Sequence, residues 1–286
     1  MSRLRVREAV DESFAYFPLA WRGAWAIVGL VAAVAAAAYV VRAIHPGYNA
    51  YFVLSYVAEI AAMTAGAGAL YRIALERDHP GDPFFRCGPG GLRWGAVEWR
   101  LLPIEIVVYV VNLCVAAAYA PLLQLVFTAA ARADGLNVVR ASVAASAALR
   151  SYHWIAFVAG PAGVAYVCVV TPIVLIGVFL YVRLSVLGIA VADLGMLGLR
   201  KAWSLTHGIF WPIFGAEAIL FGVALLARTT AYLAAVLLAR ADGHGAAAAA
   251  LWALAAQVAV SLMVLWPLVA GLRIYIYRRL AHSDAA

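Results

Sequence analysis

Charged residues are scarce in this sequence. Asp, Glu, Lys and Arg make up 12% of its 286 residues, whereas soluble domains contain about 25%. Apolar residues reach 66%, which is more than one water-soluble core of this size could bury. The composition therefore excludes an ordinary soluble globular protein, and the surplus apolar surface requires lipid.

Cysteine is also scarce, and histidine is scattered. The three cysteines, Cys87, Cys114 and Cys168, form no CxxC pair, so they support neither a disulfide framework nor a zinc site. Five of the six histidines lie near the ends of apolar stretches and form no pair at the i, i+4 spacing of helical metal ligands. We therefore expect no metal, haem or other cofactor.

Long apolar stretches dominate what the sequence does contain. Each is at least as long as the roughly 20 residues that cross a bilayer core, and they lie near residues 24–43, 50–75, 101–131, 155–182, 209–239 and 246–277. Backbone amides find no partner in hydrocarbon, and the stretches lack period-2 alternation, so helices are expected rather than a barrel. The predicted fold is all-α: a polytopic transmembrane helical bundle of about six spans, forming a single integral membrane domain over residues 1–286.

Two amphipathic segments are expected to lie at the membrane surface. Within residues 1–22, apolar and aromatic side chains recur at helical spacing while acidic and basic ones occupy another face, which is typical of an interfacial helix feeding the first span. A second such segment runs from about residue 193 to 206 and feeds the fifth span. Gly208 suits its C-terminal cap.

The distribution of arginine and lysine predicts the orientation. If the chain starts in the cytoplasm, fifteen Lys and Arg residues fall on the cytoplasmic side and six on the other. By the positive-inside rule both termini are then cytoplasmic, in a bacterial inner membrane. No cleavable export signal is expected, because more than 20 residues, three of them acidic, precede the first apolar run. The net charge of +7 is explained by topology and anionic lipid headgroups, so it gives no argument for nucleic acid.

Short motifs carry a resemblance to a known group of proteins. They are RLS at 183–185, AWSLTHGIFW at 202–211, VREAVDESF at 6–14, YRIAL at 71–75 and FRCG at 85–88. Together they resemble uncharacterised bacterial six-span inner-membrane proteins that are similar to the membrane domain attached to some glycerophosphodiester phosphodiesterases. The resemblance implies six spans, amphipathic helices before spans one and five, and no established activity. The phosphodiesterase barrel is absent from this sequence, so the resemblance implies no catalytic residue.

Ionisable groups within or beside the spans form one candidate site. Glu59 lies near the middle of the second predicted span, Glu217 about 12 Å along the fifth, and Glu105 nearer the cytoplasmic end of the third. A charge at the bilayer centre costs roughly 2.5 to 3.5 kcal/mol, so these groups should face the interior, pair with a base or be protonated. Arg183, at the cytoplasmic end of the fourth span, is the expected partner. We expect Glu59, Glu217 and Arg183 to face one another.

Two interpretations of this set remain open. It forms a proton or ligand site, or it locks helices together with the help of Asn112, Gln124 and Gln257. For Glu59 and Glu217 the two interpretations are evenly balanced. Because Glu105 and Arg183 lie closer to water, a structural role is favoured for them.

Two polar loop segments lie between the second and third predicted spans. Residues 78–83 are rich in Pro and Gly and lack a recognised ligand spacing, so consecutive turns are favoured over a metal site. Residues 86–93 offer backbone amides and the guanidinium groups of Arg86 and Arg93 to a lipid phosphate. They match no Walker or Rossmann fingerprint. Contact with an anionic lipid, without turnover, is the favoured interpretation.

Three classes of function remain, in order of preference. The first is a non-catalytic envelope, lipid-organising or accessory membrane protein, with membrane lipids as partners and no enzymatic activity. The second is a small permease or channel that uses Glu59 and Glu217. The third is a membrane-embedded lipid-modifying enzyme, which needs convergent catalytic groups at one membrane face. The sequence names no protein partner.

Overall fold

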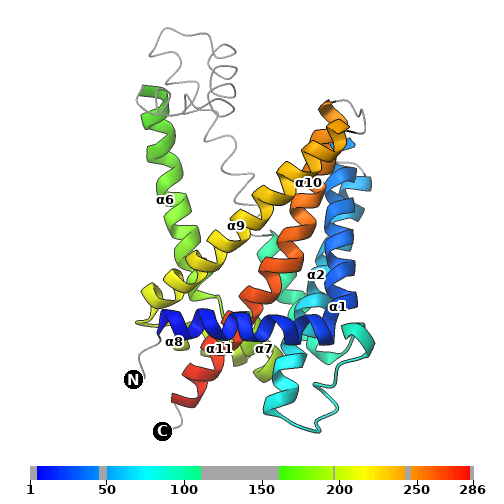
Figure 1. Ribbon diagram of the computed structural model, residues 1–286. Coiled ribbons are helices and arrows are strands. Elements are labelled where there is room, and N and C mark those ends of the chain that lie inside the picture. Colours follow the sequence, from blue (N-terminus) through cyan, green and yellow to red (C-terminus); the bar gives the residue numbers. More distant parts are fainter. Residues whose placement is uncertain (1–4, 45–49, 111–160, 196, 242–245, 284–286) are drawn as a thin grey trace. The chain divides into compact units, whose positions relative to one another are not determined.

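The described part of the chain is helical. The computed structural model describes residues 5–44, 50–110, 161–195, 197–241 and 246–283 (Figure 1). Its helices are α1 (Val6–Ile44), α2 (Ala50–Asp78), α6 (Pro161–Arg183), α7 (Leu187–Leu194), α8 (Leu197–Leu205), α9 (Phe210–Ala241), α10 (Ala246–Val260) and α11 (Trp266–Ser283). Residues 96–110 are also helical, a 3₁₀ turn covers Pro89–Gly91, and a π turn over Ser261–Leu265 joins α10 to α11.

Five helical stretches are long and apolar enough to cross a membrane. Among the described residues these are Val6–Arg42, Ala50–Asp78, Leu175–Leu194, Phe210–Leu238 and Trp252–Ala281. The predicted all-α transmembrane class is confirmed, and the chain is a multi-pass membrane protein. The predicted third span, 101–131, falls largely on residues outside the described part, as do Asn112, Gln124 and Cys114. The number six therefore stays a prediction.

The described chain divides into two compact units. One contains residues 1–106 and 182–286, and the other contains residues 107–181 with most of α6. In the first unit α1 packs against α2, α10 and α11, and α9 packs along α10. All the sites described below lie in this first unit.

Helix α1 is kinked where its sequence changes from amphipathic to apolar. Ala24 has non-helical backbone angles, φ −129° and ψ 18°. In Figure 1 the first part of α1 lies across the lower part of the view, and the second part turns and rises beside α2. Amphipathic and apolar sequence thus occupy differently directed parts of one helix.

Small residues let the helices of the first unit approach closely. Ala20, Ala69 and Ala74 are fully buried, and a Cβ added to Gly271 of α11 would lie only 2.9 Å from the Cβ of Tyr16 in α1. The Tyr16 hydroxyl in turn donates to the carbonyl of Leu70 in α2. Close backbone approach of this kind is the usual basis of helix packing in membranes.

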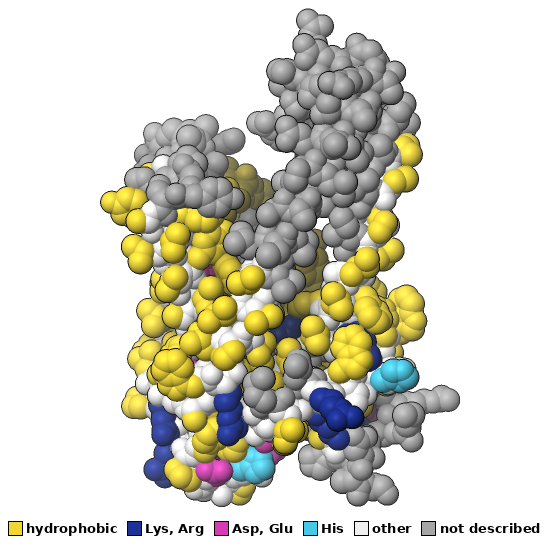
Figure 2. Space-filling view, turned by 180° about the vertical axis from the view of Figure 1, so that it is seen from behind, with side chains coloured by type: hydrophobic (Ala, Val, Ile, Leu, Met, Phe, Trp, Pro, Cys, Tyr) yellow, Lys and Arg dark blue, Asp and Glu magenta, His cyan; other side chains and the backbone are white. Residues whose placement is uncertain are grey.

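Large apolar side chains cover the outside of the helices. Leu54 in α2 is 63% exposed and Leu226 in α9 is 71% exposed. Figure 2 shows one face on which hydrophobic side chains cover most of the described surface, with Lys and Arg side chains toward the lower edge of the view. Exposed apolar surface of this extent is suited to lipid rather than to water.

The segment predicted as a second interfacial helix contains the end of α7 and all of α8. Trp203 of α8 is 44% exposed, whereas Ala202 and Leu205 are buried, so α8 has one buried face. Gly208 has φ 80°, which is the left-handed conformation that a C-terminal cap requires.

Candidate functional site

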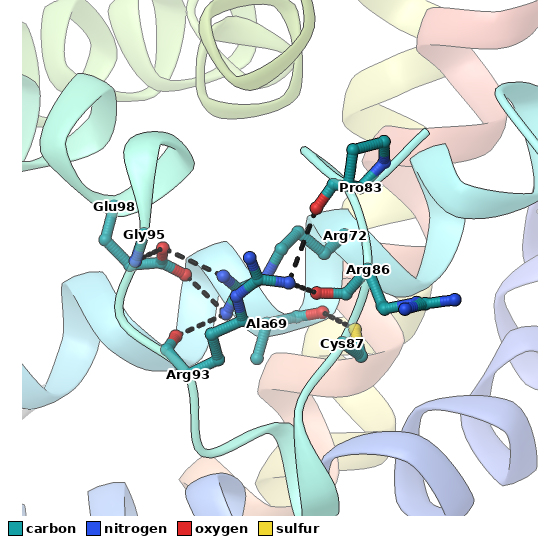
Figure 3. Close-up of polar contacts among 8 residues, drawn as sticks. All are labelled: Ala69, Arg72, Pro83, Arg86, Cys87, Arg93, Gly95 and Glu98. Carbon is teal, nitrogen blue, oxygen red and sulfur yellow. Dashed lines mark hydrogen bonds and ion pairs between the residues drawn. The ribbon is translucent and has the colours of Figure 1, made fainter. Parts of the chain in front are cut away.

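An arginine and a glutamate form an ion pair in the interior of the first unit. Arg72 of α2 and Glu98 of the helix at 96–110 have side chains that are 1% and 0% exposed. Arg72 Nη1 donates to Glu98 Oε2 at 3.0 Å, and Arg72 Nη2 lies 2.7 Å from Oε1, although that second contact lacks hydrogen-bond alignment. The pair joins two helices that are separated by a loop in sequence (Figure 3).

Backbone groups add hydrogen bonds to this buried pair. The amide of Gly95 donates to Glu98 Oε2 at 2.7 Å, and Arg72 Nη2 donates to the carbonyl of Arg93. The absence of a side chain at Gly68 makes room, since a Cβ there would overlap the Glu98 carboxylate. A charge taken out of water is tolerated only with such compensation. The geometry therefore fixes the loop before residue 96 against α2.

Arg93 holds the loop rather than projecting freely from it. Its Nη1 donates to the carbonyl of Arg86 at 2.8 Å and, more weakly, to that of Pro83 at 3.4 Å (Figure 3). The Arg86 side chain is exposed. Of the two arginines predicted to contact anionic lipid, one thus has its guanidinium directed at loop carbonyls. The lipid contact itself remains a prediction.

Cys87 lies in the same loop and faces α2. Its thiol lies 3.8 Å from the carbonyl of Ala69, and burial raises its pKa to about 11. No group of three or more His, Cys, Asp or Glu side chains that could hold a metal occurs among the described residues. The thiol is therefore a weak donor in a packed loop.

A second polar network joins α2, α7 and α11 at the end of α2. Arg278 Nε lies 2.8 Å from Asp78 Oδ2 and its Nη2 donates to the carbonyl of Ala74. The Tyr277 hydroxyl donates to Asp193 Oδ2 at 2.6 Å, and His79 Nε2 lies 3.4 Å from Asp193 Oδ1. The loop at 78–83 is thus anchored at its start by side chains from distant parts of the chain.

Glu59 has a different partner from the one predicted. Its Oε2 lies 2.6 Å from Arg42 Nη1 near the end of α1, and the two side chains are about one-fifth exposed. Arg42 also lies 4.5 Å from the centre of the Tyr56 ring. Arg42 lies in the last turn of α1, at the end of the predicted span 24–43, and its long side chain reaches Glu59.

Arg183 was the wrong choice of partner for Glu59. It is 5% exposed, with its guanidinium carbon 4.3 Å from the centre of the Trp203 ring. Its carbonyl accepts from Thr206 Oγ1 at 2.8 Å. A cation–π contact and a helix-end hydrogen bond therefore replace the expected ion pair.

Glu217 and Glu105 both lie in the electrostatic field of Arg273 of α11. Glu217 is 8% exposed, and its carboxyl oxygens make no hydrogen bond with the described residues. The structure thus gives Glu217 the neighbour Arg273 rather than Arg183. The predicted facing of Glu59, Glu217 and Arg183 is wrong, because Glu59 pairs with Arg42, Arg183 lies over Trp203 and Glu217 lies near Arg273.

A pocket lies beside the first part of α1. It has a volume of about 220 Å³ and is bounded by α1, the last turn of α2 and α11. Its charged lining residues are Glu12, Arg77 and Arg278. Sequence reasoning missed it because its three walls come from residues about 60 and 200 positions apart.

Sequence reasoning also passed over Arg72 and Glu98. Arg72 falls inside the predicted span 50–75, and an ionisable residue within a span is itself a signal of a buried partner. In the sequence it contributes to the charge bias and to the YRIAL motif, and no partner is predicted for it. Glu98 carried no comparable signal, since it lies outside every predicted span.

Comparisons with known proteins add no relative. No protein-family model, curated protein or solved structure matches this chain. The interpretation of the site therefore depends on its geometry and chemistry.

Proposed function

We propose that the protein is a non-catalytic, lipid-organising protein of the bacterial inner membrane, with both termini in the cytoplasm. The excess of Lys and Arg on one side supports this orientation. The resemblance to six-span inner-membrane proteins is consistent with it. Membrane phospholipids, with their headgroups at the cytoplasmic face, are the proposed partners.

The observation that carries this proposal is that the Arg72–Glu98 ion pair is shielded from water and from any ligand. A catalytic or transporting group must meet its reactant, but these two side chains are 1% and 0% exposed. Besides each other, they bond to backbone groups of Gly95 and Arg93. Charges arranged in this way stabilise one helix arrangement rather than offer a reactive surface.

Reconstitution tests the proposal directly. The full chain is placed in vesicles of phosphatidylethanolamine and phosphatidylglycerol, with a trapped pH-sensitive dye and a potassium gradient. Expected results are proton flux equal to that of protein-free vesicles and an unchanged lipid composition by mass spectrometry. Protein-dependent flux would replace the proposal with a permease, and a new lipid species would replace it with an enzyme.

A small permease is the second candidate, and Glu217 is the observation that favours it. Its carboxyl is buried, makes no hydrogen bond with the described residues and lies near Arg273. Buried ionisable groups in spans often mark proton pathways. If the vesicles show flux, Glu217→Gln should abolish it, while the matched change at the paired carboxylate, Glu59→Gln, tests whether any loss is specific.

A further inference from the structure

The pocket beside α1 brings opposite charges together without pairing them. Glu12 enters from α1, Arg77 from the end of α2, and Tyr275 and Arg278 from α11. Its volume of about 220 Å³ far exceeds the 10 to 15 Å³ or so that one water requires. It therefore has room for a small polar group.

Most polar groups around the pocket are already engaged. Arg278 is held by Asp78 and the Ala74 carbonyl. The Tyr275 hydroxyl donates to Glu8 Oε2 at 3.3 Å, and the Tyr16 hydroxyl donates to Leu70. Both hydroxyl groups are thereby turned toward protein acceptors.

Arg77 and Glu12 are different. Across the described residues, no hydrogen bond or ion pair joins either side chain to another residue, and they are not within ion-pair distance of each other. Both residues are exposed, so their charges are available from the pocket. An available cation and an available anion in one pocket suit a ligand that carries both charges.

The position of the pocket narrows the chemistry of that ligand. Glu12 and Tyr16 lie in the first part of α1, before the break at Ala24, which is the amphipathic segment expected at the level of the lipid headgroups. A guanidinium binds phosphate through a rigid fork of donors. A purely anionic headgroup would meet repulsion from Glu12, whereas a headgroup with an ammonium would be attracted to it.

We propose that this pocket binds a phosphoethanolamine group, as carried by phosphatidylethanolamine, with its phosphate on Arg77 and its ammonium on Glu12. The proposal rests on the proposed lipid-organising function and specifies the lipid class. The bound headgroup would link α1, α2 and α11, whose residues form the pocket walls.

Lipid retention by the intact protein tests this assignment. The full chain in detergent is equilibrated with phosphatidylethanolamine, phosphatidylglycerol or water-soluble phosphoethanolamine, and bound ligand is measured by native mass spectrometry. The pocket variants are Glu12→Gln and Arg77→Gln. Asp11→Asn and Arg200→Gln are matched controls, since they remove the same charges at exposed positions that do not line the pocket.

The expected lipid binding differs between the Glu12 and Arg77 variants. The unaltered protein should prefer phosphatidylethanolamine over phosphatidylglycerol about tenfold, which corresponds to one charge contact. Glu12→Gln should remove that preference, and Arg77→Gln should reduce binding of both lipids about tenfold. Both controls should behave like the unaltered protein. Because the altered side chains are exposed, circular dichroism should show unchanged helix content.

Other outcomes overturn the assignment. Equal binding of the two lipids to the unaltered protein, or equal effects in pocket and control variants, would exclude this pocket. Displacement of the lipid by water-soluble phosphoethanolamine at equal concentration would identify a soluble ligand instead. Protein-dependent flux in vesicles would reject the lipid-organising function while leaving this binding result intact, so the two failures can be told apart.

Discussion

At the scale of residues, Arg72 and Glu98 show what a charge needs inside an apolar bundle. The carboxylate accepts from Arg72 and from the Gly95 amide, and the guanidinium also reaches the Arg93 carbonyl. Each group therefore has several partners. Removing one member leaves the other charge buried without compensation, which is the most damaging change that such a pair can undergo.

Glu98→Gln is expected to destabilise the protein by about 3 to 5 kcal/mol, because the Arg72 charge then loses its counter-ion. The measurement is the thermal unfolding midpoint of the purified protein in detergent. Asp11→Asn is the control, since Asp11 and its partner Arg7 are 69% and 94% exposed and such pairs contribute little. Replacing both buried residues with apolar ones should cost less than Glu98→Gln. An unchanged midpoint for Glu98→Gln would contradict the inferred importance of the pair.

The raised pKa of Cys87 predicts slow, strongly pH-dependent alkylation. The thiolate is the reactive form, and a pKa of about 11 leaves about 1% of the thiol ionised at pH 9. In a variant with Cys114→Ser and Cys168→Ser, the rate of reaction with iodoacetamide should rise about tenfold per pH unit between pH 7 and pH 10. A plateau near pH 9 would show that the thiol is not buried as described.

At the scale of elements, the spacing between helices depends on residues without side chains. Gly68 of α2 lies directly against the Glu98 carboxylate, whereas Gly29 of α1 has open space around its missing Cβ. Both glycines are inside helices. Comparing alanine substitutions at the two positions therefore separates the effect of packing on stability from the effect of helix propensity.

Gly68→Ala is expected to destabilise the protein by about 1 to 3 kcal/mol, because the added methyl displaces Glu98 from its partners. Gly29→Ala should be neutral or stabilise it by up to about 1 kcal/mol, since alanine favours the helix and meets no neighbour. Thermal unfolding in detergent compares the two. Equal effects would mean that α2 does not approach Glu98 as closely as the structure shows.

The break in α1 predicts two different membrane depths within one helix. Spin labels placed singly at exposed positions 11, 14 and 18 should report one shallow depth, judged from collisions with oxygen and with a water-soluble nickel complex. Labels at positions 25, 30 and 33 should become deeper by about 1.5 Å per residue. A continuous depth gradient from position 11 onward would show a single straight span instead.

At the scale of the whole molecule, the charge bias predicts that both termini face the cytoplasm. Green fluorescent protein fused after Ala286 should fluoresce, whereas alkaline phosphatase fused there should be inactive, because the latter requires export. A fusion near residue 46, between the first two spans, is the control and should behave in the opposite way. An active phosphatase at the C-terminus would reverse the proposed orientation.

Much of the fold could be predicted from the sequence, because every span in hydrocarbon must satisfy its own backbone hydrogen bonds and therefore forms an apolar helix. The long apolar stretches gave the helical class and most of the described spans. Side-chain partners followed no such rule. Glu59 was placed inside a helix, yet its partner proved to be Arg42, because the sequence does not show which side chain of a neighbouring helix lies opposite it.

The candidate sites were harder to predict because they join distant segments. The Glu217 carboxyl was expected to be buried, but its neighbour Arg273 lies on another helix. The pocket at Glu12 and Arg77 needs three helices to meet. Apolar periodicity shows that a helix has an inner face, but it does not show which inner face of another helix lies opposite.

The Arg72–Glu98 pair has a consequence for biogenesis. Its two members are 26 residues apart, and a ribosome adds about 5 to 20 residues per second. The arginine of α2 therefore leaves the exit tunnel about one to five seconds before its counter-ion. During that interval α2 carries an uncompensated charge that opposes its passage from the translocon into lipid, so α2 and the following helix are expected to enter the bilayer as one hairpin.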